Sequence, residues 1–285
     1  MSEKVKEKVL RIGEIPYTNC YNIYYYLKRK YPVPGVEYLS GTPARLNALL
    51  RSSAIDLCLS SSIEYARGAG KYLLLPGFCI GSRGPVQSIR LFSSLPIEKL
   101  NGSRIVLTDE SATSVILCRI ILSRFLGCSN QFTTRKADLE EALRISDAVL
   151  LIGDRALAAG TRAKNLYIYE LNTIWQEHTG FPFVFALWTL RAEAVKETGE
   201  ILKAFWRSLK KVHREIEKPD EELIRTVLAE KPFFTRQRLL EYWSYICWEL
   251  SESHLRGLEL FYRLAHESGY LPGSPEIKFF DPGKR

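Results

Sequence analysis

Residues 55–60 read IDLCLS, a short apolar run that ends in a polar turn, Ser60-Ser61-Ser62. An apolar run of this length beside turn-forming residues is typical of a buried strand. The segment before it, residues 42–50 (TPARLNALL), predicts a helix with Thr42 as its N-cap and Pro43 at its first position. A helix that leads directly into a buried strand is typical of an α/β fold.

The same alternation extends back to the N-terminus. Residues 9–15 (VLRIGEI) alternate apolar and polar side chains and predict a first strand, and residues 36–39 predict a second. Between them, residues 16–22 are dense in turn formers and predict a loop, and residues 23–30 predict a helix. This order of strands and helices predicts a parallel sheet with right-handed crossovers.

Further along, the pattern indicates a second α/β unit. Residues 80–94 are strand-like, with a break at 81–85, and predict a strand that crosses into this unit. Its own strands and its main helix are predicted over residues 105–108, 115–127, 148–153 and 166–171. Residues 181–188 (FPFVFALW) are very apolar and predict a buried strand that crosses back to the first unit.

The remaining residues are predicted to be helical. Thr235 is expected to cap a helix that includes Ile246 and Cys247, and Ser251 is expected to cap another that ends at Gly269. Their aromatic and leucine stripes at helical spacing indicate packing rather than a binding site.

The length of the chain predicts its division into lobes. A chain of 285 residues exceeds the size at which single cores usually stop growing, so two lobes are expected. We assign residues 1–94 and 186–285 to lobe one, which is discontinuous, and residues 95–185 to lobe two.

The composition is that of an ordinary globular protein, with 46% hydrophobic and 25% charged residues and a net charge of +8. The basic residues are spread along the chain without a nucleic-acid-binding motif, so we expect neither nucleic acid nor membrane as a partner. The charge is compatible with an anionic small-molecule substrate. No apolar run has the length of a membrane helix or an export signal, and we expect a cytoplasmic protein.

Several chemistries lack their sequence motifs. The six cysteines form no CxxC pair and have mostly apolar neighbours, which predicts small buried hydrophobes rather than a zinc site. There is no GxGxxG, P-loop, HExxH or GxSxG motif. No histidine precedes His178, so this loop residue is the best placed of the four histidines to act as a base. We expect no metal and no organic cofactor.

Polar side chains follow the predicted strands, and ligands of open α/β sheets bind beyond the carboxyl ends of the strands. Small hydroxyls and amides, together with backbone N–H groups at helix N-termini, suit the binding of carboxylates. The Ser111–Ser114 turn is the best anion site, although its hydroxyls would equally cap a helix. The candidate site residues are Asn19, Ser60, Ser61, Gln87, Ser88, Ser111, Ala112, Thr113, Ser114, Gly153, Asp154 and Thr179.

Six segments stand in a fixed order between about residues 11 and 190. They are Gly13 with Tyr17-Thr18-Asn19-Cys20, Ile55-Asp56 with Ser60 to Ala66, Gly84 to Ser88 with Leu91-Phe92, Ser111 to Ser114 with Leu117, Asp147-Ala148 with Ile152-Gly153-Asp154, and Trp175 with Thr179 to Trp188. Together they resemble the chorismate dehydratases of the futalosine route to menaquinone. Two positions depart from that family's pattern, because Tyr21-Asn22 replace a common proline and Pro85 follows Gly84.

The resemblance implies a type II periplasmic-binding-protein fold, with a ligand cleft between two lobes. It implies a hydro-lyase that converts chorismate to 3-[(1-carboxyvinyl)oxy]benzoate and water. It also implies catalytic roles for Asn19 and Ser88, and a Ser111–Ser114 turn that holds a carboxylate.

The motif residues are Asn, Ser and Thr, with no obvious basic side chain among them. We therefore expect the base to be the enolpyruvyl carboxylate of the substrate, and Glu64 is the nearest motif carboxylate if the protein supplies one. One alternative is the sibling enzyme that releases 1,4-dihydroxy-6-naphthoate, which is similar in fold and uses a histidine base in its second lobe. The absence of histidine before His178 disfavours it. Another alternative is a non-catalytic protein that binds a small anion.

Overall fold

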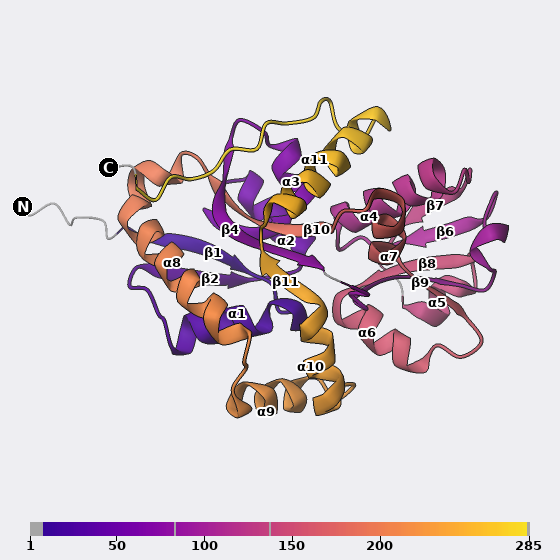
Figure 1. Cartoon of the computed structure of the whole chain (residues 1–285), viewed down its shortest axis with the longest axis horizontal. Coiled ribbons are helices and arrows are strands. Elements are labelled where there is room, and N and C mark those ends of the chain that lie inside the picture. Colours follow the sequence, from indigo (N-terminus) through magenta and orange to yellow (C-terminus); the bar gives the residue numbers. More distant parts are fainter. Residues whose placement is uncertain (1–7, 83, 137, 284–285) are drawn as a thin grey trace, which may run out of the picture.

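The computed structural model describes residues 8–82, 84–136 and 138–283. Two α/β lobes lie side by side, and each is built on one β-sheet (Figure 1). The strands of the first lobe are β1 (Leu10–Glu14), β2 (Val36–Ser40), β3 (Leu57–Ser61), β4 (Tyr72–Ser82), β10 (Val184–Arg191) and β11 (Ile246–Glu249). Those of the second lobe are β5 (Ile89–Ser93), β6 (Arg104–Leu107), β7 (Gln131–Thr134), β8 (Ala148–Ile152) and β9 (Tyr167–Glu170).

Helices cover both sheets (Figure 1). In the first lobe these are α1 (Thr18–Arg29), α2 (Pro43–Arg51), α3 (Ser62–Arg67), α8 (Ala194–Ile216), α9 (Glu221–Glu230), α10 (Arg236–Tyr245) and α11 (Glu252–Glu267). In the second lobe they are the 3₁₀ turn η1 (Ile97–Lys99), α4 (Ala112–Ile120), which continues as the π-helical turn η2 (Ile121–Phe125), α5 (Leu139–Leu143), α6 (Gly153–Arg162) and α7 (Leu171–Thr179).

The first sheet has the order β11-β4-β10-β3-β1-β2 and the second has the order β7-β6-β8-β5-β9. Strands β1, β2 and β3 pair in parallel, as the alternation of strands and helices predicts. Strand β10 lies between β3 and β4 and is antiparallel to both, which confirms that the apolar segment near residue 184 crosses back into the first lobe. Both sheets are therefore mixed rather than purely parallel.

Three local predictions are wrong, and three short elements were missed. Helix α1 begins at Thr18, inside the predicted loop, because contacts outside the helix hold its first turn: the Thr18 N–H donates to Asp154, and the Trp243 indole donates to the Thr18 carbonyl. Ile246 and Cys247 belong to strand β11 rather than to a helix, because they pair with the edge of β4.

The third wrong prediction and the missed elements concern the second lobe. The strand predicted over 80–94 is two strands, since β4 runs to Ser82 in one sheet and β5 begins at Ile89 in the other. Strand β7 and helices α5 and α7 were missed. They are short, and much of β7 and α5 is exposed, so their apolar periodicity is weak.

The division into lobes at residues 94/95 and 185/186 stays a prediction. Strand β5 pairs with β8 and β9 and therefore belongs to the sheet of the second lobe. Strand β10 belongs to the first sheet and begins at Val184. The two segments that join the sheets therefore lie before Ile89 and before Val184.

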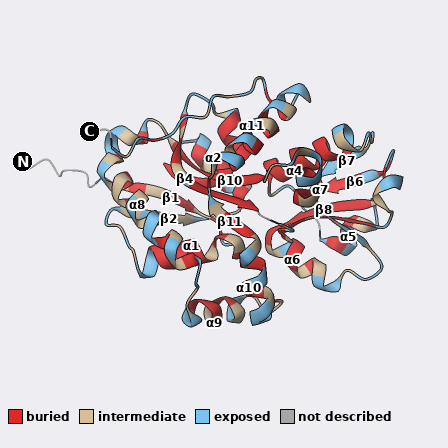
Figure 2. Ribbon diagram, viewed as in Figure 1, coloured by how far each residue is buried: buried red, intermediate tan, exposed pale blue. Residues whose placement is uncertain are grey.

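The core fills the space between the sheets and their helices (Figure 2). Helix α8 packs on the first sheet through a stripe at helical spacing that includes Leu202, Phe205 and Leu209. Five of the cysteines are buried and Cys128 is half-buried, in agreement with their predicted packing role. Thr42 and Thr235 cap α2 and α10 as predicted.

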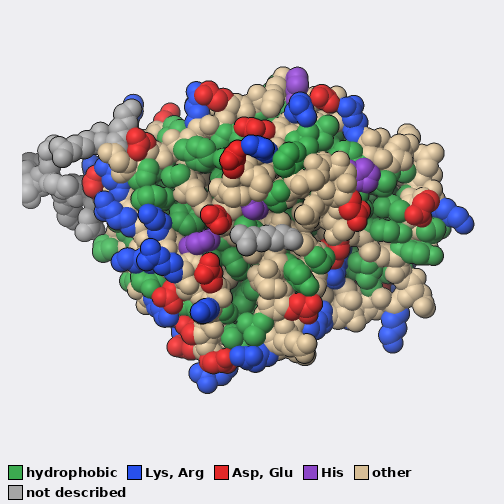
Figure 3. Space-filling model, viewed as in Figure 1, with side chains coloured by type: hydrophobic (Ala, Val, Ile, Leu, Met, Phe, Trp, Pro, Cys, Tyr) green, Lys and Arg blue, Asp and Glu red, His purple; other side chains and the backbone are tan. Residues whose placement is uncertain are grey.

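The basic residues of the first lobe lie on its surface. On the face shown in Figure 3, Lys and Arg side chains gather over the part of the first lobe near α8. None of the helices in the described residues is both long and apolar enough to cross a bilayer.

Candidate functional site

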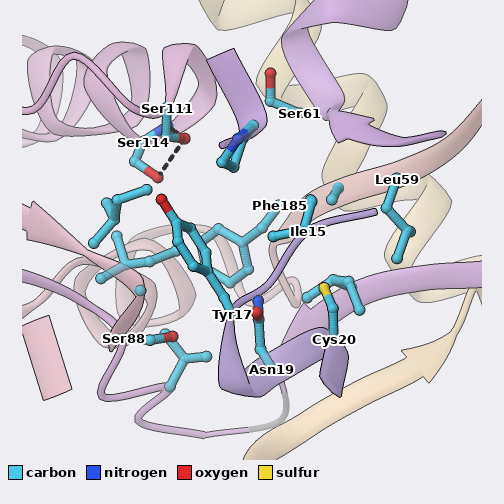
Figure 4. A pocket seen from close by; sticks show the side chains of 17 residues that line it. Ile15, Tyr17, Asn19, Cys20, Leu59, Ser61, Ser88, Ser111, Ser114 and Phe185 are labelled. Atoms are coloured by element: carbon cyan, nitrogen blue, oxygen red, sulfur yellow. Dashed lines mark hydrogen bonds between the residues drawn. The ribbon is translucent and has the colours of Figure 1, made fainter. Parts of the chain in front are cut away.

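A cavity lies between the two sheets, a place where small-molecule sites are common. Side chains from both lobes form its wall (Figure 4). The wall consists of Ile15, Tyr17, Asn19, Cys20, Pro43, Leu59, Ser61, Ile80, Val86, Ser88, Ile89, Ser111, Ser114, Ile152, Gly153, Phe185 and Ala186. Among the described residues, no Lys, Arg, His, Asp or Glu side chain is part of this wall.

The wall brings together half of the residues predicted for the site, and their roles stay predictions. They are Asn19, Ser61, Ser88, Ser111, Ser114 and Gly153. The Asn19 Oδ1 atom is buried and has no hydrogen-bond partner among the described residues. A buried acceptor without a protein partner is expected to bind a ligand or water.

The other predicted site residues lie outside the wall. Strand alternation turns Ser60 away from the cavity, and its hydroxyl donates to Thr189 Oγ1 at 2.6 Å. The Thr113 hydroxyl lies 3.2 Å from Ser62 Oγ and accepts from the Ile63 N–H, so it joins the lobes. Ala112 is the first residue of α4 and is not part of the wall.

Three further residues are occupied elsewhere. Thr179 lies in the last turn of α7, where its hydroxyl donates to the Trp175 carbonyl. Asp154 accepts from the Thr18 N–H and pairs with Lys231. Gln87 does not line the cavity, but it shapes the wall as part of the turn that presents Ser88.

A strained turn presents Ser88 to the cavity. Gln87 has φ of 53°, in the left-handed region, and its N–H donates to Glu170 Oε2 at 3.0 Å. Glu170 is held in turn by Arg90, whose Nε lies 2.5 Å from Glu170 Oε1. Burial of Glu170 raises its carboxyl pKa, while Arg90 acts in the opposite direction. Non-glycine residues hold such a conformation only where their surroundings enforce it, so the turn is a fixed support for Ser88.

The N-terminus of α4 opens onto the cavity. Ser111 is its N-cap, and its hydroxyl accepts from the Ser114 N–H at 3.3 Å and lies 3.0 Å from Ser114 Oγ. The first N–H groups of a helix have no partner inside the helix, and the helix dipole favours an anion there. This end of the cavity is therefore suited to a carboxylate. The alternative reading of Ser111 as a cap is also correct, and the two roles are compatible.

Tyr17 is the main residue of the wall that the sequence prediction left without a role. Its ring points across the cavity toward Ser111 and Ser114 (Figure 4), and its hydroxyl donates to Glu110 Oε2 at 2.9 Å. Burial, followed by the nearby Glu110 charge, raises the pKa of Tyr17 well above its usual value. The phenol therefore stays neutral at ordinary pH. In the sequence, the position of Tyr17 in the loop after the first strand could have marked it as a site residue.

Gly153 permits this position of Tyr17. A Cβ atom on Gly153 would lie 2.9 Å from Tyr17 Cδ2, and the residue has φ of 59°. Its N–H donates to the Ser88 carbonyl at 2.8 Å, so the glycine also supports the Ser88 turn. Close approach and a positive φ both require glycine here.

Two candidate bases lie away from the cavity. Glu64 is 1% exposed, pairs with Arg51 and is not part of the wall. His178 is on α7, where its ring stacks on Phe125 and its Nδ1 lies 2.9 Å from the Ile174 carbonyl oxygen.

Comparison with known proteins identifies the family. A sequence model of the family described as "Menaquinone biosynthesis" matches residues 10–267. The chain belongs to this family. Over 197 residues it is 34% identical to the chorismate dehydratase of Thermus thermophilus, and this alignment covers 64% of the chain and 70% of that relative. Over 179 residues it is 32% identical to the chorismate dehydratase of Campylobacter jejuni, and this alignment covers 61% of the chain and 64% of that relative.

The fold has relatives of a second kind. The periplasmic aliphatic sulphonate binding protein of Escherichia coli superposes with a TM-score of 0.71 at 12% identity, over 98% of this chain and 94% of that one. At this identity the likeness shows the fold alone. It confirms the predicted two-lobed periplasmic-binding-protein fold, in which the cavity described above occupies the place between the lobes.

Proposed function

We propose that the chain is a hydro-lyase that converts chorismate to 3-[(1-carboxyvinyl)oxy]benzoate and water in menaquinone biosynthesis. The observation that carries the proposal is that Asn19, on α1, and Ser88, in the segment that joins the two sheets, line the same cavity. They do so in a chain whose curated relatives are named chorismate dehydratase. The cytoplasmic location and the lack of a cofactor stay parts of the same proposal.

The substrate would be held through its two carboxylates and its ring. One carboxylate would sit at the N-terminus of α4, where Ser111 and Ser114 lie. The ring would pack on apolar side chains of the wall such as Ile152 and Phe185. Neutral donors fix the orientation of an anion without an ion pair.

The neutral wall supports a substrate-derived base. In this step the enolpyruvyl carboxylate removes the C3 proton, the C3–H electron pair forms the new ring double bond, and the C4–O bond breaks. The departing hydroxide takes the proton and leaves as water, so atoms and charge balance. Asn19 and Ser88 would hydrogen-bond the carboxylate or the departing hydroxyl. Holding the reacting groups together is worth about 7–11 kcal/mol in the best intramolecular cases.

The alternatives have less support. Glu64 lies outside the wall, so Glu64→Gln is expected to leave turnover within about threefold of wild type. His178 also lies outside it, which disfavours a histidine-dependent sibling reaction further. A protein that only binds a small anion would share the cavity but release no product.

The test is to incubate the purified, metal-stripped protein with chorismate and, in parallel, with cyclised futalosine, and to identify products by chromatography and mass. The proposal expects the aromatic ether from chorismate and nothing from the futalosine. Product from the futalosine alone would identify the sibling activity, and tight chorismate binding without product would identify a binding protein.

A further inference from the structure

Helix α1 begins at the cavity but does not cap itself. Its N-cap residue, Tyr17, makes no capping hydrogen bond, and the first turn contains no acidic residue. The first N–H groups of a helix need partners from outside it. Here the Thr18 N–H donates to Asp154 Oδ1 at 3.0 Å, across the cleft from the second lobe.

Asp154 is itself held in place. It is the second residue of α6, and its other oxygen, Oδ2, lies 2.8 Å from Lys231 Nζ. Lys231 follows α9 and also donates to the Pro16 carbonyl at 3.4 Å. The side chains of Asp154 and Lys231 are 18% and 20% exposed, so water screens the pair only in part. The Asp154 carboxylate thus joins the first residue of α1 to the start of α6, and Lys231 links it to the end of α9 and to the loop before α1.

The segment that Asp154 holds carries the proposed catalytic amide. Asn19 follows Thr18 directly, lines the cavity and has a buried Oδ1 without a partner among the described residues. Tyr17, on the other side of Thr18, bonds to Glu110 and packs against Gly153, and both of these belong to the second lobe. The placement of Asn19 therefore depends on groups across the cleft.

We infer that Asp154 is a positioning residue for the proposed dehydration: it caps α1 from the opposite lobe and so fixes Asn19 toward the substrate. This rests on the proposed function of Asn19. It replaces the expectation that Asp154 binds substrate, because Asp154 lies outside the cavity wall and its charge would repel an anionic ligand.

The kinetic test compares four variants with wild type. Asp154→Ala removes the cap and is expected to lower kcat for chorismate by on the order of 10²-fold, with KM changed by less than about threefold, because a small displacement of a reacting group is costly. Asp154→Asn keeps an acceptor oxygen and is expected to recover about tenfold of that loss. Lys231→Met removes only the ion pair and is expected to have a smaller effect than Asp154→Ala.

Asp138→Ala is the matched control. Asp138 caps α5 through its own Oδ1, which accepts from the Glu141 N–H at 2.7 Å, and it is not part of the cavity wall. It should lower stability without changing kcat. Wild-type kcat in Asp154→Ala, an equal loss in Asp138→Ala, or no recovery in Asp154→Asn would each overturn the inference.

A readout independent of turnover separates this inference from the proposed function. Amide hydrogen exchange in the first turn of α1 should be faster in Asp154→Ala than in wild type, and unchanged in Asp138→Ala. If wild type converts no chorismate but the exchange result holds, the proposed function fails and the cap stands. If wild type converts chorismate and exchange in Asp154→Ala is unchanged, the cap fails alone.

Discussion

Helices α1 and α4 both begin at the cavity, and they are capped in different ways. Helix α4 is capped by its own Ser111, within the second lobe. Helix α1 has no side-chain cap of its own and takes Asp154 from the other lobe. The N-terminus of α4, which is suited to an anion, therefore has its cap within one lobe. The N-terminus of α1, which carries Asn19, is capped only when the two lobes are in contact. Binding and chemistry should respond separately to substitutions at the two ends.

The largest effect is expected where the chemistry is proposed. Asn19→Ala and Ser88→Ala should each lower kcat for chorismate by about 10²–10³-fold, the usual cost of one donor that acts on the transition state. Stability should stay within about 1 kcal/mol of wild type. Product formation and thermal unfolding measure the two effects. Ser94→Ala, an exposed serine after β5, is the control, and equal losses in the control and in Ser88→Ala would contradict the assignment.

The next effect concerns Gly153, which lies between the two ends. Gly153→Ala places a Cβ 2.9 Å from Tyr17 at a φ of 59°, so both stability and kcat should fall. Gly127→Ala is matched for the backbone cost of about 1–3 kcal/mol, because Gly127 has φ of 65° with no atom within 4 Å of its Cβ position. Denaturant unfolding and steady-state kinetics separate the two costs. A kcat in Gly153→Ala no lower than in Gly127→Ala would show that the Tyr17 contact is unimportant.

A smaller effect is expected at the capped end of α4. Ser111→Ala should lower stability by about 1 kcal/mol and raise KM for chorismate, with kcat changed much less. Thr235→Ala removes a cap of the same length, 3.3 Å, from α10, so it should cost similar stability with no change in KM. If KM rises equally in both variants, the effect on binding comes from stability alone.

The smallest effect is expected for Tyr17→Phe, which removes only the hydrogen bond to Glu110. Glu110 has water available as a new partner, so the loss should be about 1 kcal/mol or less. Because burial raises the pKa of Tyr17, the phenol is neutral in the folded protein where an unfolded tyrosine ionises, near pH 10. Its contribution to stability is complete below that pH and is lost as pH rises further. Stability curves of the two proteins should therefore converge above about pH 10.

The sequence predicted the two-lobed fold from features with strong local signals. The apolar run before Ser60, the Thr42-Pro43 helix start and the apolar segment around Val184 each correspond to an observed element. The errors fall where tertiary contacts decide the local structure. Ile246 and Cys247 fit a helical stripe, but the free edge of β4 makes them a strand.

The sequence predicted which turns surround the site, but it predicted less well which side chains of those turns face the cavity. Ser60 and Ser61 were given the same role, and the alternation of β3 turns only Ser61 toward the cavity. Asp154 follows its strand as predicted, but its partner is an N–H group more than 130 residues earlier, at Thr18. Contacts between lobes leave no periodic signal in a single sequence.

The most direct test of the account is the pH dependence of kcat for chorismate. The described residues of the wall offer only Tyr17 and Cys20 as titratable side chains, and burial raises the pKa of each well above its usual value. If the substrate carboxylate is the base, kcat should be flat between about pH 6 and 9. A limb in kcat near pH 6–7 would show a protein base in the histidine or raised-carboxyl range and would contradict the neutral cavity as the catalyst.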